Sequence, residues 1–158
     1  MPVHSLSDLI APGAILASVG ATSQGRLMAR FARAAAPLVG CGPRDVARVL
    51  ARREAEAPTA LGGGVALPHA RLPGIARPVG LLARLEQPVP WGAMDGEPVD
   101  LAVCLLSPEA PATEHLRALA RLTRALRDRS LVSLLRGARD ADSIAAILGG
   151  PAPAACAA

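Results

Sequence analysis

Apolar residues near the start of the chain change from a continuous run to a helical spacing. The run Ile15–Val19 predicts a strand. Thr22 or Ser23 then stands as a candidate helix cap, and the next apolar residues recur every three or four positions. The pattern therefore predicts a helix after the first strand. Its expected buried residues are Leu27, Phe31, Ala35 and Leu38.

A second helix is expected directly after the first. Gly40 and Gly42 interrupt the first pattern, and Pro43 suits the first turn of a new helix, where its missing N–H costs little. The expected buried face of this second helix carries Val46, Val49 and Leu50.

The middle of the chain predicts strands at Val79–Leu85 and Val99–Leu106. The second of these runs is apolar at nearly every position, which is typical of a strand buried on both faces. The segment Pro88–Pro98 between them is rich in Pro, Gly and Asp and predicts a hairpin or an edge strand.

Helical spacing returns in the last third of the chain. It predicts a helix beginning after Pro108, a short helix over Leu131–Arg136, and a last helix capped by Asp140 or Asp142. The expected buried stripe of the first of these helices is Leu116, Leu119, Leu122 and Leu126. Helices at both ends with strands between them indicate an α/β or α+β fold with a mixed sheet. One domain is expected over residues 1–150, with a disordered tail at 151–158.

Composition narrows the classes of function. The chain has 158 residues and a formal charge of +4, and its 17 basic residues are all arginine. The arginines are interleaved with acids, and Phe31 and Trp91 are too few aromatics for the stacking platform that single-stranded nucleic acid requires. An ordinary solvated surface is therefore favoured over a nucleic-acid site, although a basic surface would suit an acidic or phosphorylated partner.

The cysteines and the apolar runs point to a cytoplasmic protein. Cys41, Cys104 and Cys156 show no Cys-x-x-Cys spacing, so neither a disulfide framework nor a zinc site is expected. The N-terminus lacks the basic stretch that begins a signal peptide. The chain also has no run of about 18 uncharged apolar residues, which a membrane-spanning helix would need. No cofactor and no metal are expected.

The segment Thr59–Arg71 carries the candidate chemistry. Three glycines allow positive φ, so that successive N–H groups could turn toward one anion, and Pro68 would hold His69 at a defined strand exit. A neutral imidazole is a competent nucleophile toward phosphorus, and phosphoryl transfer needs donors around the equatorial oxygens. The Thr59 hydroxyl and an arginine are donors of that kind. The glycines concerned are Gly62, Gly63 and Gly64.

The residues alone leave other readings open. A glycine-rich loop can be only a tight turn, and the spacing is not that of a nucleotide-binding P-loop, since the chain has no lysine. Arg53 could complement its helix dipole or could project a guanidinium into a pocket. His115, in the first turn of a helix, could be a half-buried structural residue or could hydrogen-bond another histidine or a phosphoryl oxygen.

The combined motifs resemble a known family. Thr-x-x-Gly-x-Gly-Val-Ala-Leu-Pro-His at 59–69, the pair Arg53-Glu54 and Glu-His-Leu at 114–116 are similar to the fructose/mannitol/nitrogen-regulatory group of phosphotransferase-system enzyme IIA domains. Within this group the chain most resembles the nitrogen-regulatory branch, because Arg71-Leu-Pro-Gly74 and the segment Asp95–Leu101 are similar to that branch. The early first helix departs from the family, since Gln24 and Arg26 stand where lysine is frequent.

The resemblance implies a mixed, mainly five-stranded sheet in a three-layer sandwich with flanking helices. It implies that His69 is phosphorylated by an HPr-like carrier, that His115 is its neighbour, that Arg53 stabilises charge, and that Arg71 contacts a partner. Regulatory targets of such proteins would be a transporter, a sensor kinase or a stringent-response enzyme.

Two functions other than regulation are compatible with these residues. A sugar-transport enzyme IIA would pass the phosphoryl group to a fructose- or mannitol-type IIB domain. A binding module without phosphotransfer would use His69 and His115 for a metal or small anion, but two histidines without a third matched ligand make a poor metal site.

Overall fold

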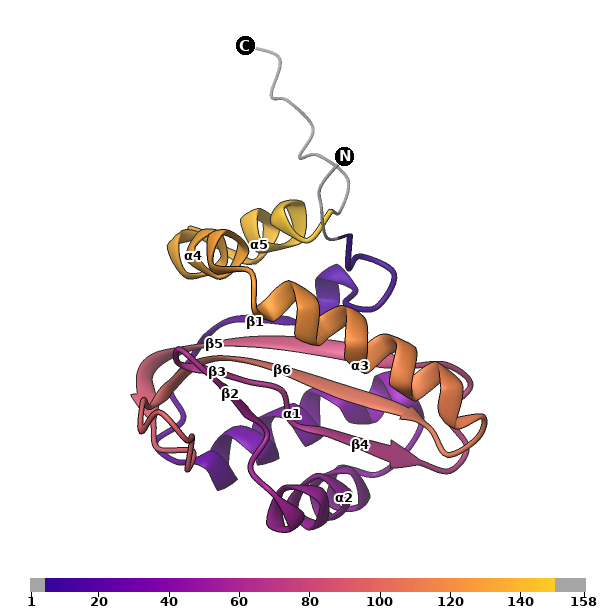
Figure 1. The fold of residues 1–158 in the computed structure, drawn as a ribbon. Helices are drawn as coiled ribbons and strands as arrows, with labels where there is room; N and C mark the ends of the chain where they lie inside the picture. Colours follow the sequence, from indigo (N-terminus) through magenta and orange to yellow (C-terminus); the bar gives the residue numbers. More distant parts are fainter. Residues whose placement is uncertain (1–4, 150–158) are drawn as a thin grey trace, which may run out of the picture.

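The computed structural model describes residues 5–149, which form a mixed sheet between two layers of helices (Figure 1). The predicted tail at 151–158 lies outside the described residues. After a 3₁₀ turn at Pro12–Ala14, the chain begins with β1 (Ile15–Val19), α1 (Gln24–Val39) and α2 (Pro43–Glu56). The remaining elements are β2 (Ala60–Gly62), β3 (Val65–Ala66), β4 (His69–Leu72), β5 (Val79–Val89), β6 (Val99–Pro108), α3 (Ala112–Leu126), α4 (Arg129–Gly137) and α5 (Ala141–Ile147).

The sheet confirms the predicted fold class and has six strands in the described residues, one more than expected. Its order is β1-β5-β6-β3-β2, and β4 also pairs with β6. Strands β5 and β6 are antiparallel, whereas β3 and β4 both run parallel to β6, at Val65↔Leu101 and His69↔Leu105. The long strand β6 therefore pairs with two short strands, β3 and then β4, which follow each other in the chain.

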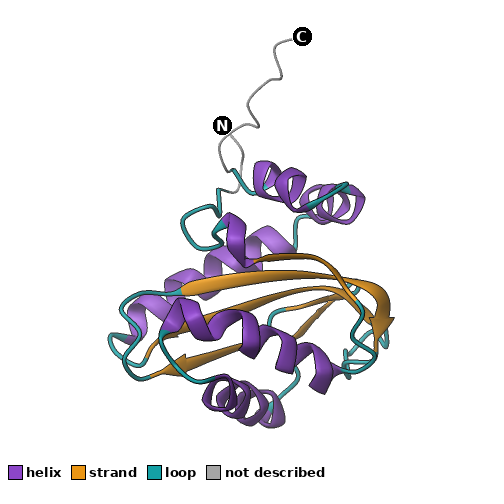
Figure 2. Cartoon of the chain, turned by 180° about the vertical axis from the view of Figure 1, so that it is seen from behind, coloured by secondary structure: helices purple, strands orange, loops and turns teal. Residues whose placement is uncertain are grey.

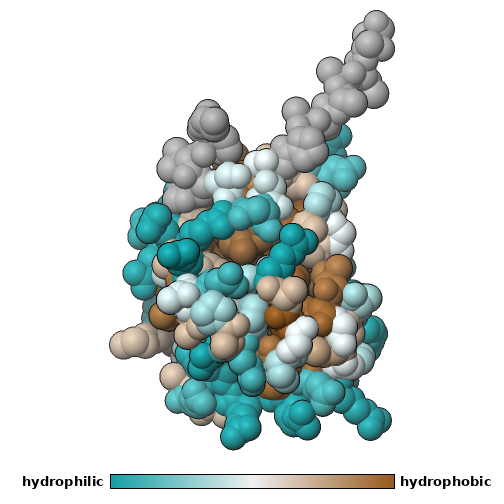
Figure 3. Space-filling model, turned by 90° about the vertical axis from the view of Figure 1, so that its right-hand side faces the viewer, coloured by the Kyte–Doolittle hydropathy of each residue, from teal (hydrophilic) through white to brown (hydrophobic). Residues whose placement is uncertain are grey.

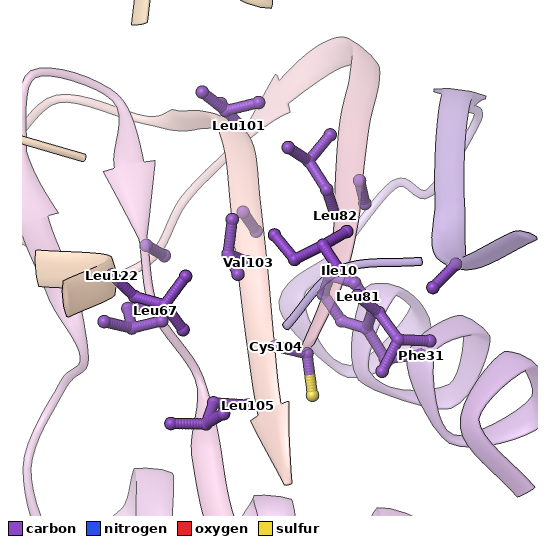
Figure 4. Close-up of a cluster of buried hydrophobic side chains, with 14 of the residues drawn as sticks. Ile10, Phe31, Leu67, Leu81, Leu82, Leu101, Val103, Cys104, Leu105 and Leu122 are labelled. Atoms are coloured by element: carbon purple, nitrogen blue, oxygen red, sulfur yellow. The ribbon is translucent and has the colours of Figure 1, made fainter. Parts of the chain in front are cut away.

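Helices cover both faces of this sheet. Figure 1 shows α3 on one side, with α4 and α5 beyond it, and α1 and α2 on the other side; the view from behind in Figure 2 shows the same layers. Strand β6 is buried along nearly its whole length, because it lies inside the sheet, which has helices on both sides (Figure 1). Its residues Leu101, Val103, Cys104 and Leu105 lie in the apolar cluster of Figure 4 together with Phe31, Leu81 and Leu122.

Local signals set several helix boundaries as predicted. The Ser23 hydroxyl accepts from the Arg26 N–H at the start of α1, and Pro43 stands in the first turn of α2. Asp140 caps α5, since its carboxylate accepts from the Ser143 N–H at 2.8 Å. Gly40 ends α1 with a φ of 70°, a conformation that glycine adopts without strain.

Two predicted buried leucines are exposed. Leu38 is 47% exposed, because the packed face of α1 also takes in Met28, Ala32 and Val39 and leaves Leu38 at its edge. Leu116 is 60% exposed, since a helix turns about 100° per residue and the packed face of α3 includes its neighbour His115. Both predictions were wrong, because the spacing of apolar residues does not determine how a helix is rotated about its axis when it packs on the sheet.

The strand predictions also needed correction. Strands β5 and β6 each extend beyond the predicted ends, to Val89 and Pro108. No strand lies between Pro90 and Pro98, so the edge strand predicted as one alternative within Pro88–Pro98 is wrong. The other alternative, a hairpin, agrees with the structure: residues 90–98 connect the antiparallel strands β5 and β6, which pair up to Val89↔Val99. The strand exit expected at His69 is wrong: β3 ends at Ala66, and His69 is the first residue of a new strand, β4. Strands β2 and β4 were not predicted, because each depends on pairing with a distant or adjacent partner rather than on a long apolar pattern.

Candidate functional site

His69 is the first residue of β4 and lies in an open pocket between α2, β4 and the start of α3. The pocket has a volume of about 780 Å³. Its ionisable lining residues are Arg52, Arg53, Glu56, His69, Arg71, Glu109 and His115. Figure 3 shows the end of the molecule at which α3 begins, where hydrophilic side chains surround a smaller apolar area. The pocket therefore combines two imidazoles with three arginines and two glutamates.

The backbone fixes the protonation of His69. Its Nδ1 lies 2.8 Å from the carbonyl oxygen of Leu67. A carbonyl can only accept a hydrogen bond, so Nδ1 carries the proton and donates. In the neutral ring, the lone pair is then on Nε2. Pro68 separates the two residues and restricts the backbone between them, which suits this short-range contact.

His115 is the second imidazole of the pocket. Its ring centroid is 5.6 Å from that of His69, and the two ring planes are tilted by 39°. The residue is 9% exposed, and its Nδ1 lies 2.8 Å from the hydroxyl of Ser107, the second-last residue of β6. The structure thus brings together the two histidines predicted from sequence, although they are 46 positions apart.

Both imidazoles are held toward the neutral form. Burial lowers the pKa of His69, with a further lowering from Arg53, against the opposing effects of the Leu67 hydrogen bond and Glu54. Burial, followed by the positive charge that His69, Arg71 and Arg53 can carry, lowers the pKa of His115 to about 4. At neutral pH the site therefore presents an uncharged nucleophile beside an uncharged second histidine.

Arg53 combines the two roles predicted for it. One of its guanidinium nitrogens donates to the carbonyl of Ala57 at 3.1 Å, which satisfies an acceptor at the end of α2. The same side chain lines the pocket and is close enough to both histidines to affect their pKa values. Arg71 is exposed at the pocket, on the strand that His69 begins.

Thr59 does not face the pocket. Its hydroxyl donates to Glu54 Oε2 at 2.6 Å and its N–H donates to Glu54 Oε1 at 2.8 Å. The indole of Trp91 also donates to Glu54, at 2.8 Å. Thr59 is 6% exposed, so its donors bind the end of α2 to the next strand and are not available to a ligand.

The three glycines are distant from His69. All three have positive φ, between 63° and 88°, as the sequence predicted. However, the carbonyl of Gly64 accepts from Asp100 and Leu101 near the start of β6, whereas His69 pairs with Leu105. Four strand residues separate these positions, or roughly 13 Å. The structure therefore does not bring the glycines predicted to bind a phosphoryl group, Gly62, Gly63 and Gly64, beside His69: they lie at the turn from β2 to β3.

Sequence reasoning missed Ser107 and the bridging role of Glu54. Ser107 is fully buried and contacts His115, yet in the sequence it is a single serine after an apolar run. A polar residue directly after a strand buried on both faces was the available signal, since such a residue needs a specific partner. In the sequence, Glu54 appears only as part of the pair Arg53-Glu54, with no role of its own.

Comparisons with known proteins show the family of this chain. Residues 9–149 match the family model described as phosphoenolpyruvate-dependent sugar phosphotransferase system, EIIA 2. The chain belongs to this family. A nitrogen regulatory protein of Bradyrhizobium diazoefficiens is 44% identical to this enzyme IIA chain, over 92% of the chain and 95% of the relative.

Solved structures extend the comparison to three dimensions. The crystal structure of nitrogen regulatory protein IIA-Ntr from Neisseria meningitidis superposes with a TM-score of 0.85, at 31% identity, and covers 90% of this chain and 98% of that one. IIA mannitol of Escherichia coli, solved in a complex with phosphorylated IIB mannitol, has a TM-score of 0.73 at 20% identity, with 90% and 100% covered. The second similarity concerns the fold alone.

The described part of the chain contains neither a metal-binding cluster nor a helix suited to span a membrane. Within residues 5–149, no His, Cys, Asp or Glu residues gather in a group of three that could hold a metal ion. None of the described helices has both the length and the apolar character that a bilayer span requires.

Proposed function

We propose that this enzyme IIA accepts a phosphoryl group on Nε2 of His69 from the phosphohistidine of an HPr-like carrier. The single observation that carries the proposal is the hydrogen bond from His69 Nδ1 to the Leu67 carbonyl, which leaves the lone pair on Nε2. The pocket around the ring is open, so a carrier's phosphoryl group could approach it.

The transfer needs no outside acid or base. The Nε2 lone pair of His69 forms a bond to phosphorus as the bond to the carrier's imidazole nitrogen breaks, and the carrier's ring recovers that electron pair. Arg53 stabilises the charge on the equatorial oxygens, and the exposed Arg71 contacts the carrier or its phosphoryl group. His115, whose ring centroid is 5.6 Å from that of His69, contacts a phosphoryl oxygen.

We further propose a regulatory role in a nitrogen-type phosphotransferase system, in the cytoplasm with its carrier. The support is the similarity to nitrogen regulatory proteins, at 44% identity over nearly the full length of both chains. A phosphoryl group adds close to two negative charges to a pocket that holds three arginines, which would change the surface that a partner protein recognises. The targets expected by resemblance are a transporter, a kinase or a stringent-response enzyme.

Intact mass after incubation with phosphoenolpyruvate, an enzyme I and an HPr-like carrier tests phosphoryl acceptance. Wild-type protein should gain one acid-labile phosphoryl group, and His69→Ala should gain none, while His115→Ala should still accept but more slowly. The absence of a gain with several carriers, or an equal gain in His69→Ala, would contradict the assignment. Pull-downs with both phosphorylation states then test regulation, which identical partner sets would rule out.

The fold similarity to IIA mannitol, which was solved with a phosphorylated IIB, supports a second candidate function. In it, the phosphoryl group on His69 passes to a fructose- or mannitol-type IIB domain. Transfer of labelled phosphate from the phosphorylated protein to a purified IIB domain would favour this candidate. Retention of the label in the presence of such domains would favour the regulatory one.

A further inference from the structure

Strand β6 ends beside the pocket with a buried hydroxyl that the proposed transfer does not use. Ser107 is 0% exposed, and its Oγ lies 2.8 Å from Nδ1 of His115. Within residues 5–149, His115 Nδ1 is the one hydrogen-bond partner of this hydroxyl. The pairing of Ser107 with Arg71 of β4 holds its backbone in register beside the strand that His69 begins.

The direction of this hydrogen bond follows from the number of available partners. If Nδ1 of His115 held the proton, Ser107 would accept, and its own O–H would lie buried without an acceptor. If Ser107 donates to Nδ1, its O–H has a partner, and only a lone pair of the hydroxyl oxygen lacks a hydrogen bond. A buried donor without a partner is the rarer and more costly of the two. The burial of Ser107 therefore favours donation from its hydroxyl to the imidazole.

Donation from Ser107 fixes the tautomer of His115. A neutral imidazole that accepts at Nδ1 carries its proton on Nε2. His69 has the opposite arrangement, with its proton on Nδ1 and its lone pair on Nε2. The two rings, with centroids 5.6 Å apart in one pocket, then offer one nucleophilic nitrogen and one N–H donor.

We propose that Ser107 is a positioning residue that donates its hydroxyl proton to Nδ1 of His115 and so keeps His115 as an Nε2–H donor to a phosphoryl oxygen on His69. The inference deepens the proposed phosphoryl acceptance at His69 and, for the role of the donor, rests on it. Burial lowers the pKa of His115 to about 4 before transfer, so the ring meets the incoming phosphoryl group as a neutral N–H donor.

The nitrogen chemical shifts of the histidine side chains test the tautomer directly. In wild-type protein labelled with ¹⁵N-histidine, long-range proton–nitrogen spectra at pH 7.5 should show His115 protonated at Nε2 and His69 protonated at Nδ1. In Ser107→Ala, the Nδ1 signal of His115 should move toward the protonated value, because the ring can then exchange its proton between both nitrogens. Cys104→Ala, which removes another buried side chain of β6, should leave both shifts unchanged.

The rate of phosphoryl transfer tests the consequence. Ser107→Ala should accept the phosphoryl group about tenfold more slowly, as expected when one transition-state hydrogen bond is weakened, while Ser107→Thr, which keeps the hydroxyl, should recover most of the rate. Cys104→Ala should react as wild type.

The two proposals fail in different ways. A wild-type spectrum with the His115 proton on Nδ1, or unchanged shifts and rate in Ser107→Ala, would overturn the role of Ser107 whether or not His69 is phosphorylated. Correct tautomers with no phosphoryl gain in wild type would instead refute the function proposed for His69, and with it the donor role of His115.

Discussion

A polar cluster lies at each end of strand β6, and the two clusters differ in which of their polar atoms have hydrogen-bond partners within the protein. At the glycine end, defined here by the turn Gly62–Gly64 with Asp95, Asp100 and Arg136, the Gly63 N–H donates to Asp95 and Arg136 donates to both Asp100 and the Gly63 carbonyl. At the histidine end, defined by His69, Ser107 and His115, both Nδ1 atoms are paired inside the protein.

The difference shows what makes a polar cluster chemically useful. At the glycine end, arginine, aspartate and backbone groups satisfy one another, so the cluster stabilises a turn. At the histidine end, internal hydrogen bonds occupy Nδ1 of each ring, and Nε2 of each ring is left for the proposed transfer. The glycines Gly62–Gly64 and His69 belong to one segment of the chain, but they lie at opposite ends of strand β6.

The largest expected effect separates the arginines of the two ends. Arg53→Ala should slow phosphoryl acceptance by roughly 100-fold or more, because a positive donor to the transferring oxygens is lost. Arg136→Ala removes a guanidinium from the glycine end and should leave the rate within about twofold. Quench-flow transfer from a labelled carrier measures both rates. Equal losses in the two variants would remove the distinction between the ends.

The next effect concerns stability at the glycine end. Gly64→Ala should lower the free energy of unfolding by about 2–4 kcal/mol, since its φ is 79° and an added Cβ would lie 2.7 Å from the Arg136 guanidinium. Gly25→Ala, in α1 with open space around it, should be neutral or slightly stabilising. Urea unfolding monitored by circular dichroism compares them. A Gly64→Ala protein as stable as Gly25→Ala would show that the turn tolerates other residues.

Glu54 links α2 to Thr59 and Trp91 and should give a smaller loss. Glu54→Gln weakens the hydrogen bonds from Thr59 and Trp91 and should cost about 2 kcal/mol of stability, the range for bonds to a charged group. Trp91 is the chain's single tryptophan, so its fluorescence reports the same change. Glu56→Gln, at an exposed position of the same helix, is the control. Unchanged fluorescence and stability in Glu54→Gln would argue against this bridge.

The smallest effect is a pH dependence from His115. Its pKa is lowered to about 4 in the folded protein, so below pH 6.5 the unfolded chain takes up a proton that the folded chain does not. Stability therefore falls as the pH decreases from 6.5 toward 4, by about 1 kcal/mol between pH 7.5 and 5.5. Urea unfolding at both values should show this loss in wild type and a smaller one in His115→Gln. The same loss in both proteins would assign it to other groups.

Local features of the sequence determined much of this protein. The spacing of apolar residues, the caps Ser23 and Asp140 and the first-turn proline Pro43 were enough to predict α1, α2 and α5, because helix formation depends on residues within a few positions. The long apolar runs of β5 and β6 predicted the centre of the sheet for the same reason. His69 was a candidate from its motif before any contact was known.

Tertiary structure decided which polar groups share the site. The pairing of β3 and β4 with different parts of β6 separates Gly64 from His69, and the packing of α3 turns His115 inward while Leu116 is exposed. The hydrogen bonds of Thr59 and Ser107 depend on Glu54 and His115 in other elements. Strand register and helix rotation arise from contacts between residues far apart in the chain, so spacing along the sequence could not determine them.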